Sequence, residues 1–130
     1  MSEHEKMVKI IRFALVKIGC KINHLGFQYL CYAVELVILN PKAIHSLLKE
    51  VYQKISDEFH VGNRMTVHSS IRNVIEETSE TGSFLELNNM FKMELYTLDD
   101  KPTCGEIIGL LAEYYTLKLY KNEEIFKDFD

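Results

Sequence analysis

Cys20 and His24 are the first residues of the chain whose types and spacing could support catalysis. A thiol and an imidazole four residues apart can act as nucleophile and general base when one face of a helix carries both. Gly19 directly precedes this pair, however, and a glycine often ends a helix in the left-handed conformation. The two side chains need not share a face, so we expect a buried thiol beside a solvated histidine.

The rest of the sequence contains no pattern typical of an enzyme or a metal site. GxSxG, HExxH, P-loop and GxGxxG motifs are all absent. The histidines lack metal-ligand spacing, and we interpret them as scattered surface residues: His4, His24, His45, His60 and His68. Neighbouring acids are interpreted as solvated helix faces or tail: Asp57 and Glu58, Glu76 and Glu77, Glu123 and Glu124. We therefore predict that the protein is not an enzyme and carries no metal or cofactor.

A different kind of function is suggested by a polar helix face, whose side chains could bind DNA and recognise its bases. Val67, Ile71, Val74 and Ile75 repeat with a helical period. The opposite face carries residues that can pair with bases or phosphates, and these include Thr66, Ser69, Arg72 and Asn73. Arginine can donate a forked pair of hydrogen bonds to guanine, and asparagine can pair with adenine. Many helical hairpins show the same pattern without binding DNA, so the pattern alone leaves both readings open.

The charge distribution does not favour nucleic acid, because binding requires the neutralisation of phosphates. The chain has 130 residues and a net charge of −4. Residues 42–82 hold five basic and six acidic side chains, a net charge of −1. The basic part of the chain is residues 1–21, with five basic and two acidic side chains and a net charge of +3.

Helices must position these side chains, because the apolar residues repeat with a helical period along most of the chain. The periodicity predicts helices at about 7–18, 26–39, 41–59, 65–80, 83–90 and 103–119. The segment 26–39 is apolar nearly all round, which is typical of a central buried helix. We therefore predict an all-α bundle of five to six helices, with a helix-turn-helix at about 42–80.

Local signals support several of these boundaries. Pro41 follows Asn40 and can open the third helix in its first turn. Ile44, Leu47, Leu48, Val51, Tyr52 and Ile55 form the apolar face expected of this helix, which Phe59 closes. Ser83 with Glu86, and Thr103 with Glu106, have the spacing of capping boxes. Phe91 to Leu98 alternates in polarity, so it is either a short extended segment or irregular.

The length and composition suit one domain over residues 1–120, followed by a charged tail at 121–130. No apolar run approaches the roughly 20 residues of a membrane-spanning helix, and residues 1–9 lack an apolar secretory core. The three cysteines (Cys20, Cys31 and Cys104) have no CxxC spacing and fit reduced thiols. We expect a cytoplasmic protein that has no contact with a membrane.

The order and spacing of many residues between about Ile10 and Leu119 form a recognisable pattern. In the first three helices these are Ile18, Gly19, Gly26, Tyr29, Leu30, Ala33, Tyr52, Ile55 and Phe59. In the rest of the chain they are Val67, Ile71, Arg72, Ile75, Glu76, Phe91, Lys101, Pro102, Thr103, Glu106, Ile108 and Ala112. With these residues the chain resembles, along most of its length, the DNA-binding effector domain of the master response regulator of sporulation initiation.

This resemblance implies an all-α domain that binds double-stranded promoter DNA as a paired module and switches transcription. In the family the domain follows a phosphorylatable receiver, whereas here the first helix begins almost at Met1. We therefore expect a DNA-binding transcriptional regulator that works without a receiver domain. It could act as a homodimer or together with a related regulator.

The recognition helix departs from the family at several exposed positions. Thr66 and Ser69 stand where the family has arginine, His68 where it has glutamate, and Asn73 where it has histidine. Arg72 keeps one of the family's basic residues. The turn before the helix is one residue longer, and Arg64 partly replaces a lost arginine. We expect DNA contacts from Arg64, Thr66, His68, Ser69, Arg72, Asn73 and Lys101.

These departures also support an alternative function. A diverged module could have lost DNA binding and act through protein–protein interaction or dimerisation. The acidity of the chain favours this reading, because fewer cations remain to neutralise phosphates. Ile125, Phe126 and Phe129 in the tail could then enter the groove of a partner.

Overall fold

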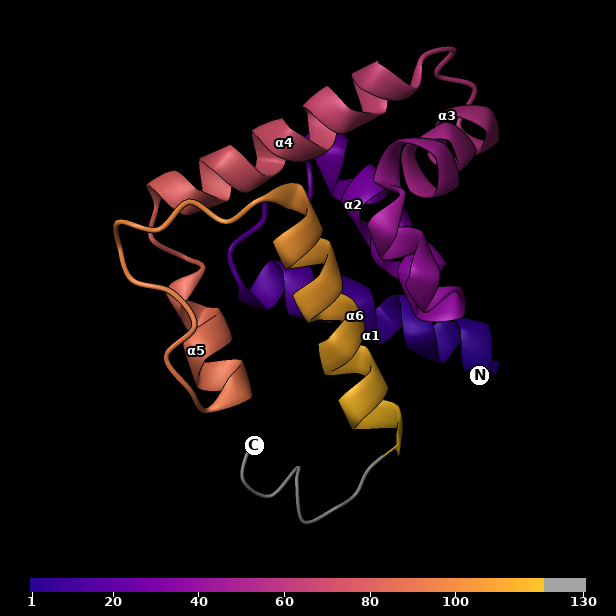
Figure 1. The fold of residues 1–130 in the computed structure, drawn as a ribbon. Coiled ribbons are helices and arrows are strands. Elements are labelled where there is room, and N and C mark those ends of the chain that lie inside the picture. Colours follow the sequence, from indigo (N-terminus) through magenta and orange to yellow (C-terminus); the bar gives the residue numbers. More distant parts are fainter. Residues whose placement is uncertain (121–130) are drawn as a thin grey trace.

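The computed structural model describes residues 1–120, and over that range the chain is helical, without a strand (Figure 1). Its six α-helices are α1 (Glu3–Lys17), α2 (Leu25–Leu39), α3 (Gln53–Glu58), α4 (Arg64–Glu80), α5 (Leu85–Phe91) and α6 (Cys104–Tyr120). None of these helices is long and apolar enough to cross a membrane. The predicted all-α class is confirmed, while the tail at 121–130 lies outside the described residues.

Helix α2 forms the centre of the bundle, as its uniformly apolar sequence predicts. It packs against α1, α4 and α6, and Figure 1 shows it passing behind the helices that follow. Phe27, Leu30 and Val34 of this helix have no exposed surface. Leu15 from α1, Ile71 from α4 and Ile107 from α6 meet them in the core and are equally buried. Burial of large apolar side chains from four helices is the main stabilising contribution to the fold.

The approach of α2 to α4 depends on Gly26. A Cβ atom at this position would lie 2.1 Å from the backbone oxygen of Ser70 in α4. Only glycine allows two backbones to come this close. The glycine therefore fixes the distance at which α4 crosses the central helix.

The prediction of one continuous helix at about 41–59 is wrong. Ser46 has φ −147° and ψ 59°, which interrupts the helix between a 3-10 helix, η1 (Pro41–His45), and a π-helix, η2 (Leu47–Tyr52). Helix α3 then follows η2 directly. Because the period changes twice, the expected apolar face is not uniformly buried, and Leu48 and Phe59 are each 42% exposed. Phe59 instead packs edge-on against Tyr29 and Tyr32, at ring-centroid distances of 5.4 and 5.6 Å.

Two of the predicted boundary signals are confirmed. Gly19 follows α1 with a left-handed φ of +91°. At α6, the Thr103 hydroxyl accepts a hydrogen bond from the Glu106 N–H at 3.1 Å, and the Glu106 carboxylate accepts from the Thr103 hydroxyl at 3.2 Å. The left-handed conformation of Gly19 marks the end of α1, and the hydrogen bonds between Thr103 and Glu106 fix the start of α6.

The predicted cap at Ser83 is wrong. Helix α5 begins at Leu85 without a side-chain cap, and the Ser83 hydroxyl bonds the Thr81 hydroxyl instead. Of the two alternatives for Phe91 to Leu98, the irregular one is correct: α5 continues through Phe91 and Lys92 ends it at φ 53°. The chain then runs without helix or strand to the start of α6.

Candidate nucleic-acid interface

Helices α3 and α4 are joined by a tight turn whose geometry is set by its own residues. His60 has φ 55° and Gly62 has φ 85°, so the chain reverses within a few residues. The Val61 N–H donates to the Ser56 carbonyl at 2.9 Å, which ties the turn to α3. The Asn63 side chain accepts a hydrogen bond from the Met65 N–H at 2.8 Å and caps α4. An asparagine just before a periodic segment is a helix-start signal, and the sequence carries it at Asn63.

One face of α4 is buried in the core. Val67, Ile71, Val74 and Ile75 are at most 2% exposed, and they pack toward α2 and the η2–α3 segment. This burial fixes the rotation of the helix about its axis. The opposite face consequently points away from the core. Helix α4 itself runs along the upper edge of the molecule in Figure 1.

The outward face gathers four of the predicted DNA-contacting residues. At about 100° per residue, Thr66, Ser69, Arg72 and Asn73 fall within an arc of about 120°. Thr66, Arg72 and Asn73 are exposed, and Ser69 is half-buried. Arg64 is exposed at the first residue of the helix. The Arg72 Nε lies 3.8 Å from a carboxylate oxygen of Glu76, a loose pair that leaves the Arg72 side chain 54% exposed.

The two flanking residues, His68 and Lys101, lie at the side of this face. The His68 ring stacks on Tyr52 of η2, with ring centroids 5.2 Å apart and planes 10° apart, so the imidazole packs against the protein. Lys101 is exposed on the segment between α5 and α6, and it lines the same groove as His68 and Arg72. The structure thus brings Lys101 beside α4 although 29 positions separate it from Arg72.

The positively charged N-terminal part of the chain is not part of this face. Helix α1, which carries most of it, packs against α2 and α6 and lies below α4 in Figure 1. Arg64 and Arg72 are the cations of α4, and Glu76 and Glu80 are exposed on the same helix. Any contact with phosphates at this face must therefore come from a few local cations.

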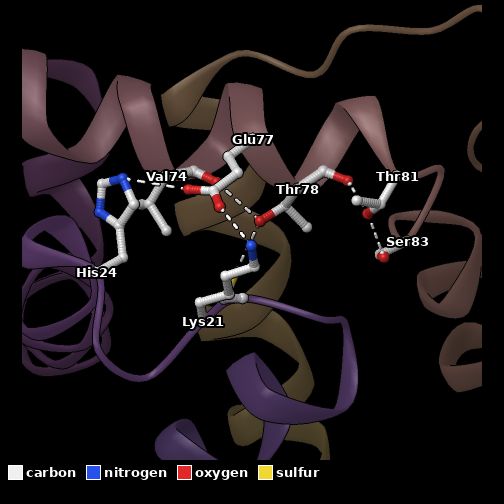
Figure 2. Close-up of polar contacts among 8 residues, drawn as sticks. Lys21, His24, Val74, Glu77, Thr78, Thr81 and Ser83 are labelled. Carbon is white, nitrogen blue, oxygen red and sulfur yellow. Dashed lines mark hydrogen bonds and ion pairs between the residues drawn. The ribbon is translucent and has the colours of Figure 1, made fainter.

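A polar network holds the C-terminal half of α4 against the segment between α1 and α2 (Figure 2). The Glu77 carboxylate lies 2.9 Å from the Lys21 ammonium and 3.4 Å from Nε2 of His24. The Lys21 ammonium, by hydrogen bond and by charge, lowers the pKa of Glu77 below its ordinary value. The other ring nitrogen of His24, Nδ1, accepts a hydrogen bond from the Gly26 N–H at 2.9 Å and caps α2.

These contacts correct two interpretations drawn from the sequence. His24 is half-buried and bonded on both ring nitrogens, so it is not a solvated histidine. Glu77 joins α4 to the segment between α1 and α2 and is not simply part of a solvated face. Its position on the helix, between the outward arc and the buried face, is the sequence signal for this role. His68 is not a scattered surface group either, since its ring stacks on Tyr52. His4 is exposed, as expected, and contacts Glu35 at the surface.

Cys20 is buried, as expected, and does not pair with His24. The Thr78 hydroxyl donates to the Cys20 sulfur at 3.4 Å and to the Val74 carbonyl at 2.7 Å. Burial raises the pKa of Cys20 to about 11, so the thiol stays protonated near neutral pH. Within residues 1–120 no three His, Cys, Asp or Glu side chains are grouped so that they could hold a metal ion.

The chain also matches a known protein family. Residues 11–115 match the family described as the sporulation initiation factor Spo0A C terminal. The matched range begins within α1 and ends within α6, so it includes the α3–α4 turn and the outward face of α4.

Proposed function

The chain belongs to the family of the sporulation initiation factor Spo0A C-terminal domain, and from this premise we propose that it is a transcriptional regulator that reads promoter DNA with α4. The observation that carries the proposal is the outward arc of Thr66, Ser69, Arg72 and Asn73 on a helix whose rotation the core fixes. Side chains early on the second helix of a helix-turn-helix are those that reach base edges in the major groove. The proposed site of action is the cytoplasm.

Each residue has a distinct proposed role. Arg72 donates a forked pair of hydrogen bonds to guanine, and Asn73 pairs with adenine. Thr66 and Ser69 contact phosphates or bases, and Arg64 at the start of the helix contacts phosphate. Lys101 and His68 contribute from the flank. The number of cations is small, so we expect a shallow dependence of affinity on salt, with a log–log slope of only a few units.

A fluorescence-anisotropy titration with genomic DNA fragments over a salt series tests the proposal. We expect some fragments to bind more tightly than others and the affinity to fall as salt rises. An absence of binding at low salt would contradict the proposal. That result would favour the alternative, a protein-interaction module that kept the fold and lost DNA binding.

Arg72→Ala tests the assignment of the reading helix. We expect it to weaken binding to the preferred fragment by roughly 1–3 kcal/mol and to reduce the preference among fragments, because a bidentate base contact is lost. Lys17→Ala is the matched control, since it removes one exposed positive charge at the end of α1. If both variants lose the same affinity for all fragments, Arg72 acts only through its charge and the assignment is wrong.

A further inference from the structure

A second groove, the α1–α6 groove, lies between the N-terminal part of α1 and the C-terminal part of α6, two helices that pack against each other (Figure 1). It has a volume of about 400 Å³, and Ile10, Phe13 and Tyr114 are among its mainly apolar lining residues. Phe13 is 65% exposed, although the next two residues, Ala14 and Leu15, are buried in the core. A partner that covers the Phe13 ring would gain free energy from its burial.

The lining of the α1–α6 groove is positively charged at its polar positions. Within residues 1–120 the lining contains no acidic side chain, and its three charged residues are Lys6, Lys9 and Lys118. The Lys6 ammonium lies 3.4 Å from a carboxylate oxygen of Glu3, and both side chains are more than half exposed, so Glu3 offsets at most one of the three charges. The Lys118 ammonium lies 5.6 Å from the centre of the Tyr114 ring. The groove therefore suits a partner that is apolar and acidic.

The ten residues that follow α6 in the sequence have this complementary composition. Residues 121–130 contain four acidic and two basic side chains, a net charge of −2. Three large apolar residues stand among the acids: Ile125, Phe126 and Phe129. Opposite charges that face each other fix the orientation of two surfaces. A cavity of about 150 Å³ can hold a benzene ring, so a groove of about 400 Å³ has room for both phenyl rings.

The position of this segment in the chain allows it to reach the groove. From Tyr114 to Tyr120 helix α6 advances six positions, or about 9 Å at 1.5 Å per residue. An extended chain spans about 3.3–3.6 Å per residue, so six residues beyond Tyr120 can span about 20 Å. That length allows Phe126 to return to the level of Tyr114 and to cross the 8–10 Å that typically separates two packed helices. Because a short connection gives an effective concentration on the order of millimolar, even a weak site is occupied.

We propose that the α1–α6 groove binds residues 123–130 of the same chain. Phe126 and Phe129 pack on the apolar lining around Phe13, and the acidic residues of the segment pair with the lysines of the groove. The bound segment joins the C-terminal end of the chain to α1. This contact does not depend on the DNA-binding function proposed above, because no lining residue of the groove belongs to the outward arc of α4.

Amide NMR spectra of the whole chain test this contact. We expect a variant with both Phe126→Ala and Phe129→Ala to shift the amides of Ile10, Phe13 and Tyr114, because two aromatic rings leave the groove. Leu98→Ala is the control, since it removes a side chain that is 72% exposed and lies outside this groove. The dispersion of each spectrum shows whether the variant is folded. Unshifted groove amides in the folded double variant would overturn the proposal.

A lysine substitution tests the charged part of the contact. The positions of the groove amides, on a scale from the wild type to the double variant, give the fraction of protein with a filled groove. Lys9→Gln should lower the ratio of filled to open groove by roughly two- to fivefold, the usual effect of an exposed ion pair. Lys17→Gln is the matched control, because Lys17 is an exposed lysine of α1 that does not line the groove. Equal effects of the two substitutions would overturn the pairing with the groove lysines.

Two further measurements test the other possible occupants of the groove. The fraction of filled groove should stay constant over a wide range of protein concentration. A fraction that rises with concentration would mean that the segment enters the groove of a second copy, and it would overturn the contact within one chain. Vesicles of phosphatidylglycerol should leave the groove amides of the wild type unchanged. Equal shifts of these amides by vesicles in the wild type and the double variant would overturn the proposal in favour of an anionic lipid surface.

Discussion

Gly26 and Gly62 are both required, but for different physical reasons. At Gly26 a Cβ atom would meet the Ser70 backbone oxygen at 2.1 Å, whereas at Gly62 it would meet nothing within 4 Å. Gly62 needs glycine because its φ is +85°. We expect Gly62→Ala to lower the free energy of unfolding by roughly 1–2 kcal/mol, the cost of a left-handed alanine. Gly26→Ala should cost more, roughly 3 kcal/mol, because a backbone must move.

Urea unfolding of both variants measures these free energies. Amide NMR spectra add a second readout, because Gly26→Ala should shift resonances along α2 and α4, whereas Gly62→Ala should shift only the turn. Equal losses of stability with equally local spectral changes would show that α4 does not depend on the close approach at Gly26.

Glu77 makes the stability of the fold depend on pH. The pKa of Glu77 is lowered from 4.5 in the folded state, mainly because its carboxylate accepts a hydrogen bond from Lys21. The ionised carboxylate therefore stabilises the fold at pH values above 4.5, and this contribution is lost as the pH falls through the lower folded pKa. We expect the difference in melting temperature between the wild type and Glu77→Gln to shrink as the pH falls from neutral to acidic values.

Glu113→Gln serves as the reference for this measurement, because Glu113 is an exposed carboxylate on α6. Its difference from the wild type should stay small over the same pH range. A Glu77→Gln difference that does not change with pH would mean that the Lys21 contact contributes nothing to stability.

At the level of the elements, Asn88 organises the irregular segment between α5 and α6. Its side-chain oxygen accepts from the Leu95 and Tyr96 N–H groups at 2.7 and 3.0 Å, and its amide donates to the Tyr96 carbonyl at 2.8 Å. These bonds replace those of a regular helix or strand. We expect Asn88→Ala to reduce stability by roughly 2 kcal/mol, since several half-buried backbone groups lose partners.

Hydrogen exchange distinguishes a local effect from a global one. In Asn88→Ala the amides of Leu95 and Tyr96 should exchange much faster, while those in the centre of α2 change only with the overall stability. Asn89→Ala is the matched control, because the Asn89 side chain bonds only the exposed Glu86 carboxylate among the contacts described. Unchanged protection of Leu95 and Tyr96 would contradict the role of Asn88.

The same elements show which parts of the fold the sequence predicts. Long amphipathic helices such as α1, α4 and α6 are predicted well, because a constant period of apolar residues reports one buried face. The segment 41–58 is not, because the break at Ser46 leaves the apolar spacing helix-like while η1 and η2 change the period. The role of Asn88 could not be predicted for a related reason. Its partners are backbone groups seven and eight positions away, and the periodicity of apolar residues does not indicate such contacts.

At the scale of the whole molecule, the burial of the three cysteines determines how fast each thiol reacts. Burial raises the pKa of Cys20 to about 11 and that of Cys31 to about 12. Cys104 is half-buried at the groove beside α4, and burial raises its pKa as well. We expect Cys104 to react first with a disulfide reagent, and Cys20 and Cys31 to react only as fast as the protein unfolds.

Mass spectrometry of the labelled protein assigns each phase, and in concentrated denaturant all three thiols should react together. A single fast phase for all three in the folded protein would contradict the burial of Cys20 and Cys31.

At the same scale, only part of the candidate site could be predicted from the sequence. The outward arc of α4 follows from helical spacing alone, so Thr66, Ser69, Arg72 and Asn73 could be predicted. The groove beside α4 could not, because Leu47, Arg72 and Leu98 come from three separate segments that only the packing of η2, α4 and α6 brings together. Lys101 could be selected from the sequence, but only the fold shows that it lines the same groove as Arg72.

The π-helix η2 has a bearing on how relatives of this chain are aligned. Because its hydrogen bonds span five residues, where those of an α-helix span four, the segment Leu47–Tyr52 contains one residue more than an α-helix between the same two ends. A relative that is one residue shorter here can keep η1 and α3 in place with an ordinary α-helical turn. A single-residue gap between Ser46 and Gln53 therefore marks a change of helix type, and the outward face of α4 stays in register across it.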